Sequence, residues 1–318
     1  MEYLTDLKAI LHSKRANVFY LEKCRVMAKD GRVVFLTKEK DSFNFWNIPI
    51  ANTIVLLLGT GTSITQAAVR LLAAAGVVIG FTGSRSTPLL MGTEIEWLCP
   101  QSEYRPTEYV QGWVKFWFNE EDRLNAGKYF QKKRISCINK IWEYDREIRE
   151  YVRNPELLGH ATKNFFKDID NSNNSEELLR AEAIFTKRIY KIAAAATGID
   201  NFVRDRDSID LANIYLNHGN YLAYGLGASV LWVLGIPYGL AVIHGKTRRG
   251  ALVFDVADLI KDAIVLPLAF MCSQVDYGEQ YFRSRCMELF IKHKAMEFMF
   301  ETVKLVASHD YFSGGPLP

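Results

Sequence analysis

Hydrophobic and polar residues alternate over much of the first hundred positions, which is the pattern of strands that are buried on one face. The dipeptide Asp30-Gly31 separates two of these runs and predicts a tight hairpin. An unbroken apolar run just after Gly76 is typical of a fully buried strand. The predicted strands are residues 18–21, 25–27, 32–36, 43–46, 53–58 and 77–81.

One short helix is expected within this β-rich region, over residues 64–75, with Ser63 and Gln66 as a capping box and Gly76 as its end. It follows the loop 59–64, Gly-Thr-Gly-Thr-Ser-Ile, whose glycines invite a phosphate-binding interpretation. The loop lacks both the third glycine of a dinucleotide fingerprint and the Gly-Lys-Ser/Thr of a Walker loop. A tight strand-to-helix turn is therefore the favoured interpretation.

After residue 105 the hydrophobic positions recur every three or four residues, as in amphipathic helices. A polar loop is expected at residues 167–175, and residues 308–318 are expected to form a tail. The predicted helices cover residues 106–152, 177–196, 208–224, 255–271 and 277–307. The change of period predicts an α+β fold, with a small β-rich N-terminal domain, residues 1–105, followed by a larger all-α C-terminal domain, residues 106–318.

An uncharged stretch of 23 residues, 221–243, is long enough to cross a bilayer. It is interrupted by Gly235-Ile236-Pro237, which predicts a break between two elements. We therefore expect a buried helix followed by a turn, and no membrane association. The start of the chain shows no basic and apolar secretory signal, and the five cysteines have no Cys-x-x-Cys spacing. Both features predict a cytoplasmic protein with reduced thiols.

The formal net charge is only +3, so a nucleic-acid-binding protein of this composition must use local basic patches. The segment 241–262 contains such a patch, with Lys246, Arg248 and Arg249 in a glycine-flanked loop. Their geometry and charge suit phosphate groups. No Ser-His-Asp arrangement or Gly-x-Ser-x-Gly motif suggests a hydrolytic nucleophile.

Two apolar runs of the same segment bring His244 and a pair of aspartates toward one place. Asp255 and Asp258 are three residues apart and share one helix face. Carboxylates at a helix start are stabilised by the helix dipole, so a solvated, salt-bridged surface is one interpretation. The alternative is a metal site, because carboxylate oxygens with one imidazole suit Mn²⁺ or Mg²⁺. Glu182, on a helix with an opposite apolar face, is a candidate third ligand.

These motifs together resemble the Cas-one proteins, the integrases of CRISPR adaptation, in the branch of type I, subtype F systems. The resemblance runs over nearly the whole chain and rests on the combination of its pieces. Besides the helix around Glu182, the matching segments are residues 46–52, 56–65, 76–81, 210–213, 218–221 and 244–258.

The resemblance implies a metal-dependent catalytic centre in the helical domain. The metal ligands fall on Glu182, His244 and Asp258, and Asp255 matches a second acidic position of the catalytic centre. Lys261 matches a basic position beside it, so it joins Lys246, Arg248 and Arg249 as a weak candidate for DNA contact. No organic cofactor is implied. Many relatives have glutamate where Asp258 stands, which is chemically equivalent but longer.

The implied activity is joining the 3′-hydroxyl ends of short foreign DNA fragments to the CRISPR array by transesterification. The implied partners are double-stranded DNA, a second copy of the chain that dimerises through the N-terminal domain, and Cas-two, fused in this subtype to the nuclease-helicase Cas-three. Two alternatives remain open from the residues alone. One is a metal-dependent endonuclease on branched DNA, and the other is a non-catalytic DNA-binding scaffold of the adaptation complex.

Overall fold

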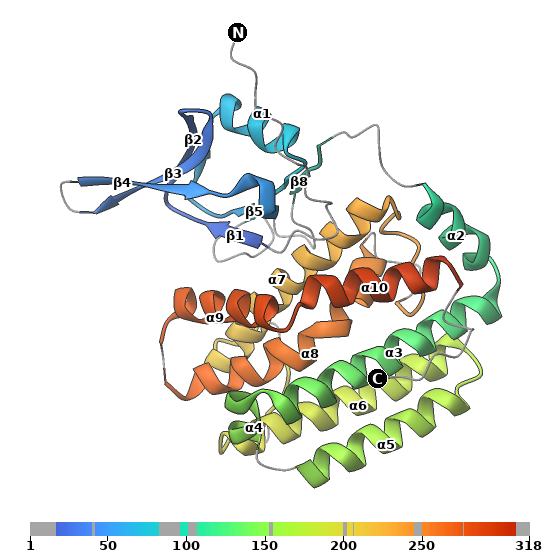
Figure 1. Ribbon diagram of the computed structural model, residues 1–318. Helices are drawn as coiled ribbons and strands as arrows, with labels where there is room; N and C mark the ends of the chain where they lie inside the picture. Colours follow the sequence, from blue (N-terminus) through green and yellow to red (C-terminus); the bar gives the residue numbers. More distant parts are fainter. Residues whose placement is uncertain are drawn as a thin grey trace. The chain divides into compact units, whose positions relative to one another are not determined.

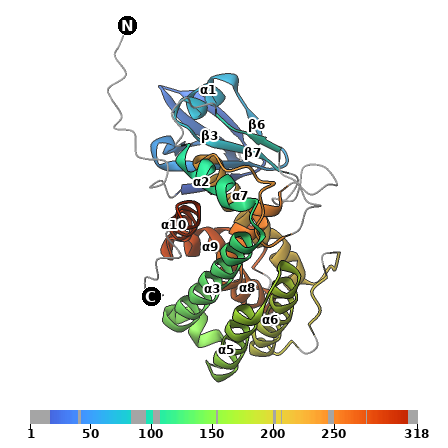
Figure 2. The ribbon, with the colours of Figure 1, turned by 90° about the vertical axis from the view of Figure 1, so that its right-hand side faces the viewer.

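The computed structural model describes residues 17–39, 42–82, 96–100, 107–152, 155–199, 202–205, 207–244, 250–275 and 277–309. The chain divides into two compact units, residues 1–105 and 106–318. In the described residues the first unit holds the strands and one α-helix, and the second is helical (Figures 1 and 2). The predicted α+β fold class, a β-rich region followed by an all-α region, is confirmed.

The first unit is built on two four-stranded sheets. One has the order β1-β5-β7-β8, in which β1, β5 and β7 are parallel and β8 runs antiparallel to β7. The other has the order β4-β3-β2-β6. The strands are β1 Asn17–Leu21, β2 Arg25–Lys29, β3 Arg32–Glu39, β4 Ser42–Ile48, β5 Thr53–Leu58, β6 Ser63–Ile64, β7 Val78–Phe81 and β8 Glu96–Leu98. The sequence pattern predicted all of these except the short β6 and β8.

Local chemistry explains these strands. Asp30 and Gly31 both have positive φ, 51° and 71°, as a two-residue hairpin between β2 and β3 requires. Every residue of β5 is buried, because β5 lies between two parallel neighbours inside its sheet. Leu56 and Leu58 of β5 join a core that includes Ala68 and Leu72 of helix α1, Gln66–Ala74.

The loop before α1 is a tight structural turn. The amides of Gly59 and Ser63 donate to the carbonyls of Leu21 and Cys24, so these donors are already used within the unit. The predicted capping box is wrong, because Ser63 lies in β6 and Thr65 caps α1 by accepting from the amide of Ala68. The interpretation of this loop as a turn, in preference to a phosphate site, agrees with these contacts.

The second unit consists of nine helices in its described residues. They are α2 Glu108–Trp117, α3 Glu120–Tyr144, α4 Arg146–Val152, α5 Pro155–Asn171, α6 Ser175–Ala196, α7 Leu211–Leu234, α8 Ala251–Gln274, α9 Glu279–Lys292 and α10 Ala295–Ala307. Helix α8 is the central one, buried along most of its length and packed against α3, α4, α6, α7, α9 and α10 (Figures 1 and 2).

Several helix limits differ from the predicted ones. Helix α5 continues to Asn171, so the first part of the predicted polar loop is helical. Helix α7 runs ten residues past its predicted end and stops at the left-handed Gly235. It passes through Gly227, where it packs closely on α8: a Cβ there would lie 3.0 Å from the carbonyl oxygen of Val253. The predicted helix 277–307 is broken at Lys294, which is left-handed with φ 52°.

The predicted break within the uncharged stretch is confirmed, since Gly235 closes α7 with φ 71°. In the described parts of the chain, none of the helices has the length and apolar character needed to cross a membrane. The five cysteines form no disulfide.

Candidate metal centre

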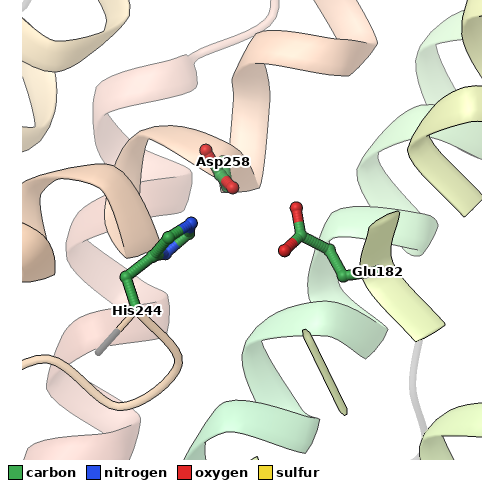
Figure 3. A group of neighbouring side chains, drawn as sticks. All are labelled: Glu182, His244 and Asp258. Carbon is green, nitrogen blue, oxygen red and sulfur yellow. The ribbon is translucent and has the colours of Figure 1, made fainter. Parts of the chain in front are cut away.

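Three side chains from different parts of the helical unit point toward one another (Figure 3). Glu182 comes from α6, Asp258 from α8, and His244 from the segment that follows α7. Each offers one ligand atom, and these atoms all lie within 4.8 Å of one another. Two carboxylates and an imidazole at this separation form an arrangement that can hold a divalent cation.

Asp255, one turn before Asp258 on α8, fixes the segment that carries His244. Its Oδ2 accepts hydrogen bonds from the amides of Val242 and Ile243, at 2.8 and 3.1 Å. Its Oδ1 accepts from the amide of His244 at 3.1 Å and lies 2.6 Å from the Nδ1 of the same residue. A carboxylate can only accept, so Nδ1 carries the proton and Nε2 is left for a ligand.

The same contact sets the protonation of the imidazole. Burial alone would lower the pKa of His244, but the hydrogen bond and the charge of Asp255, with the nearby charges of Asp258 and Glu182, raise it to about 9. Without a metal, the imidazole is therefore protonated on both ring nitrogens at neutral pH, and a cation that binds Nε2 displaces the proton there. Metal-ligating histidines commonly have such a carboxylate partner, which orients the ring.

Asp258 is a buried carboxylate with few partners. Burial would raise its pKa, but the positive charges of Lys261, Arg134 and His244 lower it, so the group stays ionised. Lys261 forms an ion pair with Oδ1, while Oδ2 accepts no hydrogen bond from the described residues. A buried carboxylate oxygen without a donor is costly unless a cation binds it. The donor set and this oxygen therefore fit a hard divalent metal.

Glu182 is held by a buried arginine that the sequence analysis did not single out. Arg134 of α3 donates to Glu182 Oε1 at 2.9 Å and, through Nε, to Asp262 Oδ2 of α8 at 2.7 Å. It also donates to Gln131 at 3.1 Å and to Thr186 at 2.9 Å, and its Nη2 forms a second contact with Asp262 Oδ2. The guanidinium thus bridges a candidate ligand and a second buried carboxylate.

A sequence signal for Arg134 exists. It occupies the apolar stripe of α3, four residues from Phe130 and four from Ile138, where a charged residue is unusual. Asp262 likewise lies four residues after Asp258, on the same face of α8. Neither position identifies its partner, because the partner lies on another helix.

The interpretation of Asp255 and Asp258 as a solvated acidic helix start is wrong. Helix α8 begins at Ala251, so Asp255 and Asp258 lie beyond its first turn. Both are buried, at 1% and 2% exposure. Of the basic candidates, Lys261 is largely buried beside Asp258, while Lys246, Arg248 and Arg249 lie outside the described residues.

The family model described as CRISPR associated protein Cas1 matches residues 19–303, from β1 to α10. The chain belongs to the Cas1 family. This is the Cas-one family that the sequence motifs resemble. Two curated relatives, the CRISPR-associated endonucleases Cas1 of Pseudomonas aeruginosa and Pectobacterium atrosepticum, are each 51% identical to the chain. The first match covers 97% of this chain and 98% of the relative, and the second covers 96% of both.

The Cas1 chain also shares its fold with a solved casposase bound to integration product. The TM-score is 0.70 at 10% sequence identity, and the match covers 92% of this chain and 91% of that one. The likeness extends over both units, so the order of a β-rich region followed by a helical one is common to the two proteins.

Proposed function

We propose that Glu182, His244 and Asp258 hold a divalent cation, Mn²⁺ or Mg²⁺, and that Asp255 orients His244 for this role. The observation that carries the proposal is the convergence of three ligand atoms within 4.8 Å, one of them from a buried carboxylate whose Oδ2 has no donor in the described residues. Oxygen ligands with a single imidazole favour these hard cations over structural zinc.

We further propose that the chain is the integrase of CRISPR adaptation, in a subtype F system. In the reaction a 3′-hydroxyl oxygen of a short DNA fragment bonds to a phosphorus of the CRISPR repeat, and the repeat's own 3′-oxygen leaves and takes up a proton. A bound divalent cation would stabilise the negative charge that develops on the phosphate and the leaving oxygen. Membership of the Cas1 family supports this activity.

The chain's own residues have defined parts in this proposal. Asp255 keeps a proton on Nδ1 of His244 and leaves Nε2 as the ring nitrogen available to a metal. Arg134 fixes the carboxylate of Glu182 through a hydrogen bond to Oε1. Lys261 helps to keep Asp258 ionised. No covalent enzyme intermediate is required, because the attacking oxygen belongs to the DNA.

The proposed partners follow from the family. They are double-stranded DNA, a second copy that dimerises through residues 1–105, and Cas-two, fused to Cas-three in this subtype. Lys246, Arg248, Arg249 and Lys261 are proposed to contact phosphates; Lys261 is largely buried and pairs with Asp258.

A second candidate function is cleavage of branched DNA, because both close relatives carry the name endonuclease. The same centre would then direct water, in place of a 3′-hydroxyl, at the phosphate. The scaffold alternative has less support, since all three candidate ligands and Asp255 are in place.

The test uses a branched DNA that mimics a half-integrated fragment, with Mn²⁺ or EDTA, and with and without the Cas-two partner. We expect strand joining that needs both Mn²⁺ and a 3′-hydroxyl, and a loss of at least about a thousandfold in Asp258→Asn. Asp170→Asn is the matched control, because Asp170 is an exposed aspartate that pairs with Lys132.

Each outcome of this test selects one function. Cutting without joining would favour the endonuclease. Joining that survives Asp258→Asn would move the catalytic centre elsewhere. If the wild type binds the DNA but neither joins nor cuts it under any condition, the scaffold function is favoured.

A further inference from the structure

Helix α2 holds the segment that carries His244. The indole N–H of Trp113 donates to the carbonyl of Leu240 at 3.0 Å, and that of Trp117 donates to the carbonyl of Ala241 at 2.8 Å. These acceptors lie four and three residues before His244. The next three amides, of residues 242–244, donate to Asp255. Five consecutive residues are thus tied to two helices, through carbonyls to α2 and through amides to α8.

Helix α2 is itself firmly placed. The ring of Trp113 has no exposed surface and contacts Phe116 and Phe130, with ring centroids 5.1 and 6.3 Å away. At Gly112 the helix touches α10 along the backbone, since a Cβ would lie 2.0 Å from the carbonyl oxygen of Ala307. Helix α2 therefore cannot shift without displacing its neighbours.

The orientation of the Trp117 indole is also set. Arg123 donates to the carbonyl of Trp117 at 2.9 Å, and its guanidinium lies 5.4 Å from the centre of the indole ring. A cation over an aromatic face is attracted to it, so Arg123 restrains the ring as well as the backbone. The indole N–H then points to one acceptor, the carbonyl of Ala241.

We propose that Trp113 and Trp117 are positioning residues for His244. Their hydrogen bonds fix residues 240–241, so that the three following amides and the imidazole all meet Asp255. Without them, the segment would depend on its bonds to Asp255 and on packing, and a slide along α2 would carry His244 away from Glu182 and Asp258. The link to metal binding rests on the proposed function, whereas the placement of the segment does not.

The test replaces the indoles by a ring without the donor, in Trp117→Phe and Trp113→Phe. The matched control is Trp142→Phe, because the buried Nε1 of Trp142 donates to a carbonyl too, that of Ala263 in α8, at 3.1 Å. Each variant loses one indole hydrogen bond inside the same unit, but only the first two lose a bond to the His244 segment. Two quantities are measured in the purified chain: hydrogen exchange of the amides of residues 242–244 without metal, and the Kd for Mn²⁺.

We expect exchange of these three amides to be about tenfold faster in Trp117→Phe and in Trp113→Phe, because their bonds to Asp255 open more often. The Kd for Mn²⁺ is expected to rise about tenfold, the lower end of the effect of removing an outer support of a metal ligand. Trp142→Phe should leave both quantities within about twofold of wild type, even if its melting temperature falls as far as those of Trp113→Phe and Trp117→Phe.

Unchanged exchange at residues 242–244 in both α2 variants would overturn the proposal, and so would an equal increase in Trp142→Phe. If the wild type binds no Mn²⁺ while exchange still responds only to the α2 variants, the proposed metal site fails and the positioning role stands. If Mn²⁺ binding weakens without faster exchange, the indoles do not act through the segment, and the proposal is again wrong.

Discussion

The two sides of the candidate metal centre are held by different kinds of interaction. On the His244 side, three backbone amides and one imidazole N–H converge on the single carboxylate of Asp255. On the Glu182 side, the guanidinium of Arg134 lies between the carboxylates of Glu182 and Asp262. The first side is a loop fixed by directional bonds to its backbone, and the second is a set of helix side chains fixed by buried charge.

This difference follows from what each side must place. Glu182 already sits on the rigid helix α6, so one charged hydrogen bond from Arg134 is enough to orient its side chain. His244 lies in a segment without regular structure, whose backbone has many accessible conformations. Fixing it takes several bonds to the backbone itself. The Glu182 side should therefore lose its geometry when the charge of Arg134 is removed, and the His244 side when the acceptor Asp255 is removed.

The largest effect on stability is expected from Arg134→Met. The change leaves Asp262 and Glu182 buried without their cation, and removing one partner of such a pair costs about 3–5 kcal/mol. We expect this loss in the free energy of unfolding, measured by urea denaturation. Arg146→Met is the control, because its pair with Glu150 is exposed at both ends and should contribute less than about 1 kcal/mol.

A double variant sharpens the comparison. Arg134→Met combined with Asp262→Leu removes the cation and its most buried partner together, and should recover part of the lost stability. Equal losses in Arg134→Met and Arg146→Met would show that the Glu182 side is not held by buried charge.

The next effect is expected from Asp255→Asn. One oxygen of the carboxylate becomes an NH₂ group. This group cannot accept a hydrogen bond from the N–H donors that face it. We expect a loss of about 2–3 kcal/mol in the free energy of unfolding. The affinity for Mn²⁺, measured by titration, should fall by about 10–100-fold, as for other partners of metal-bound histidines. Wild-type affinity in this variant would mean that His244 needs no acceptor.

Local sequence chemistry predicted the β-rich unit well. A hairpin such as Asp30-Gly31 depends on the backbone preferences of two adjacent residues, and these preferences follow directly from the residue types. The break at Gly235 was predicted for the same reason, whereas the helix before it was predicted to end at residue 224, although α7 continues through Gly227, which packs against α8. A glycine's role between helices cannot be seen from its neighbours in the chain.

The metal centre shows the same limit. The i,i+3 spacing put Asp255 and Asp258 together. Glu182 was only one candidate from its helix pattern, and the resemblance to a family assigned it as a ligand. Arg134, Trp113 and Trp117 were missed because each acts on a residue more than 40 positions away. Such pairings depend on which helix faces which, and this is decided by the packing of the whole unit.

A third buried carboxylate, Asp145, combines both kinds of support. It caps α4, where Oδ1 accepts from the amides of Glu147 and Ile148 at 3.1 and 3.2 Å. Its Oδ2 accepts from Lys292 Nζ at 2.7 Å and from His293 Nε2 at 2.8 Å, just before the left-handed Lys294. It thus ties the junction of α9 and α10 to the end of α3 through two side chains, while the amides of α4 hold its other oxygen.

The smallest effect is expected from Asp145→Asn, and it depends on pH. Burial would raise the pKa of Asp145, but the hydrogen bonds from Lys292, Ile148 and His293 lower it below its usual value. The stability this gives is fully present above the pKa of the unfolded chain, about 4, and is lost as pH falls toward the lower folded value. Asparagine caps a helix as well as aspartate does, so only the bonds from Lys292 and His293 are weakened, which costs about 1–2 kcal/mol at pH 7. Urea denaturation should show this gap in the free energy of unfolding between wild type and variant at pH 7, and a narrowing gap below pH 4. No gap at pH 7 would mean that the amides alone hold Asp145, and a gap independent of pH would mean that it does not come from the charge of the carboxylate.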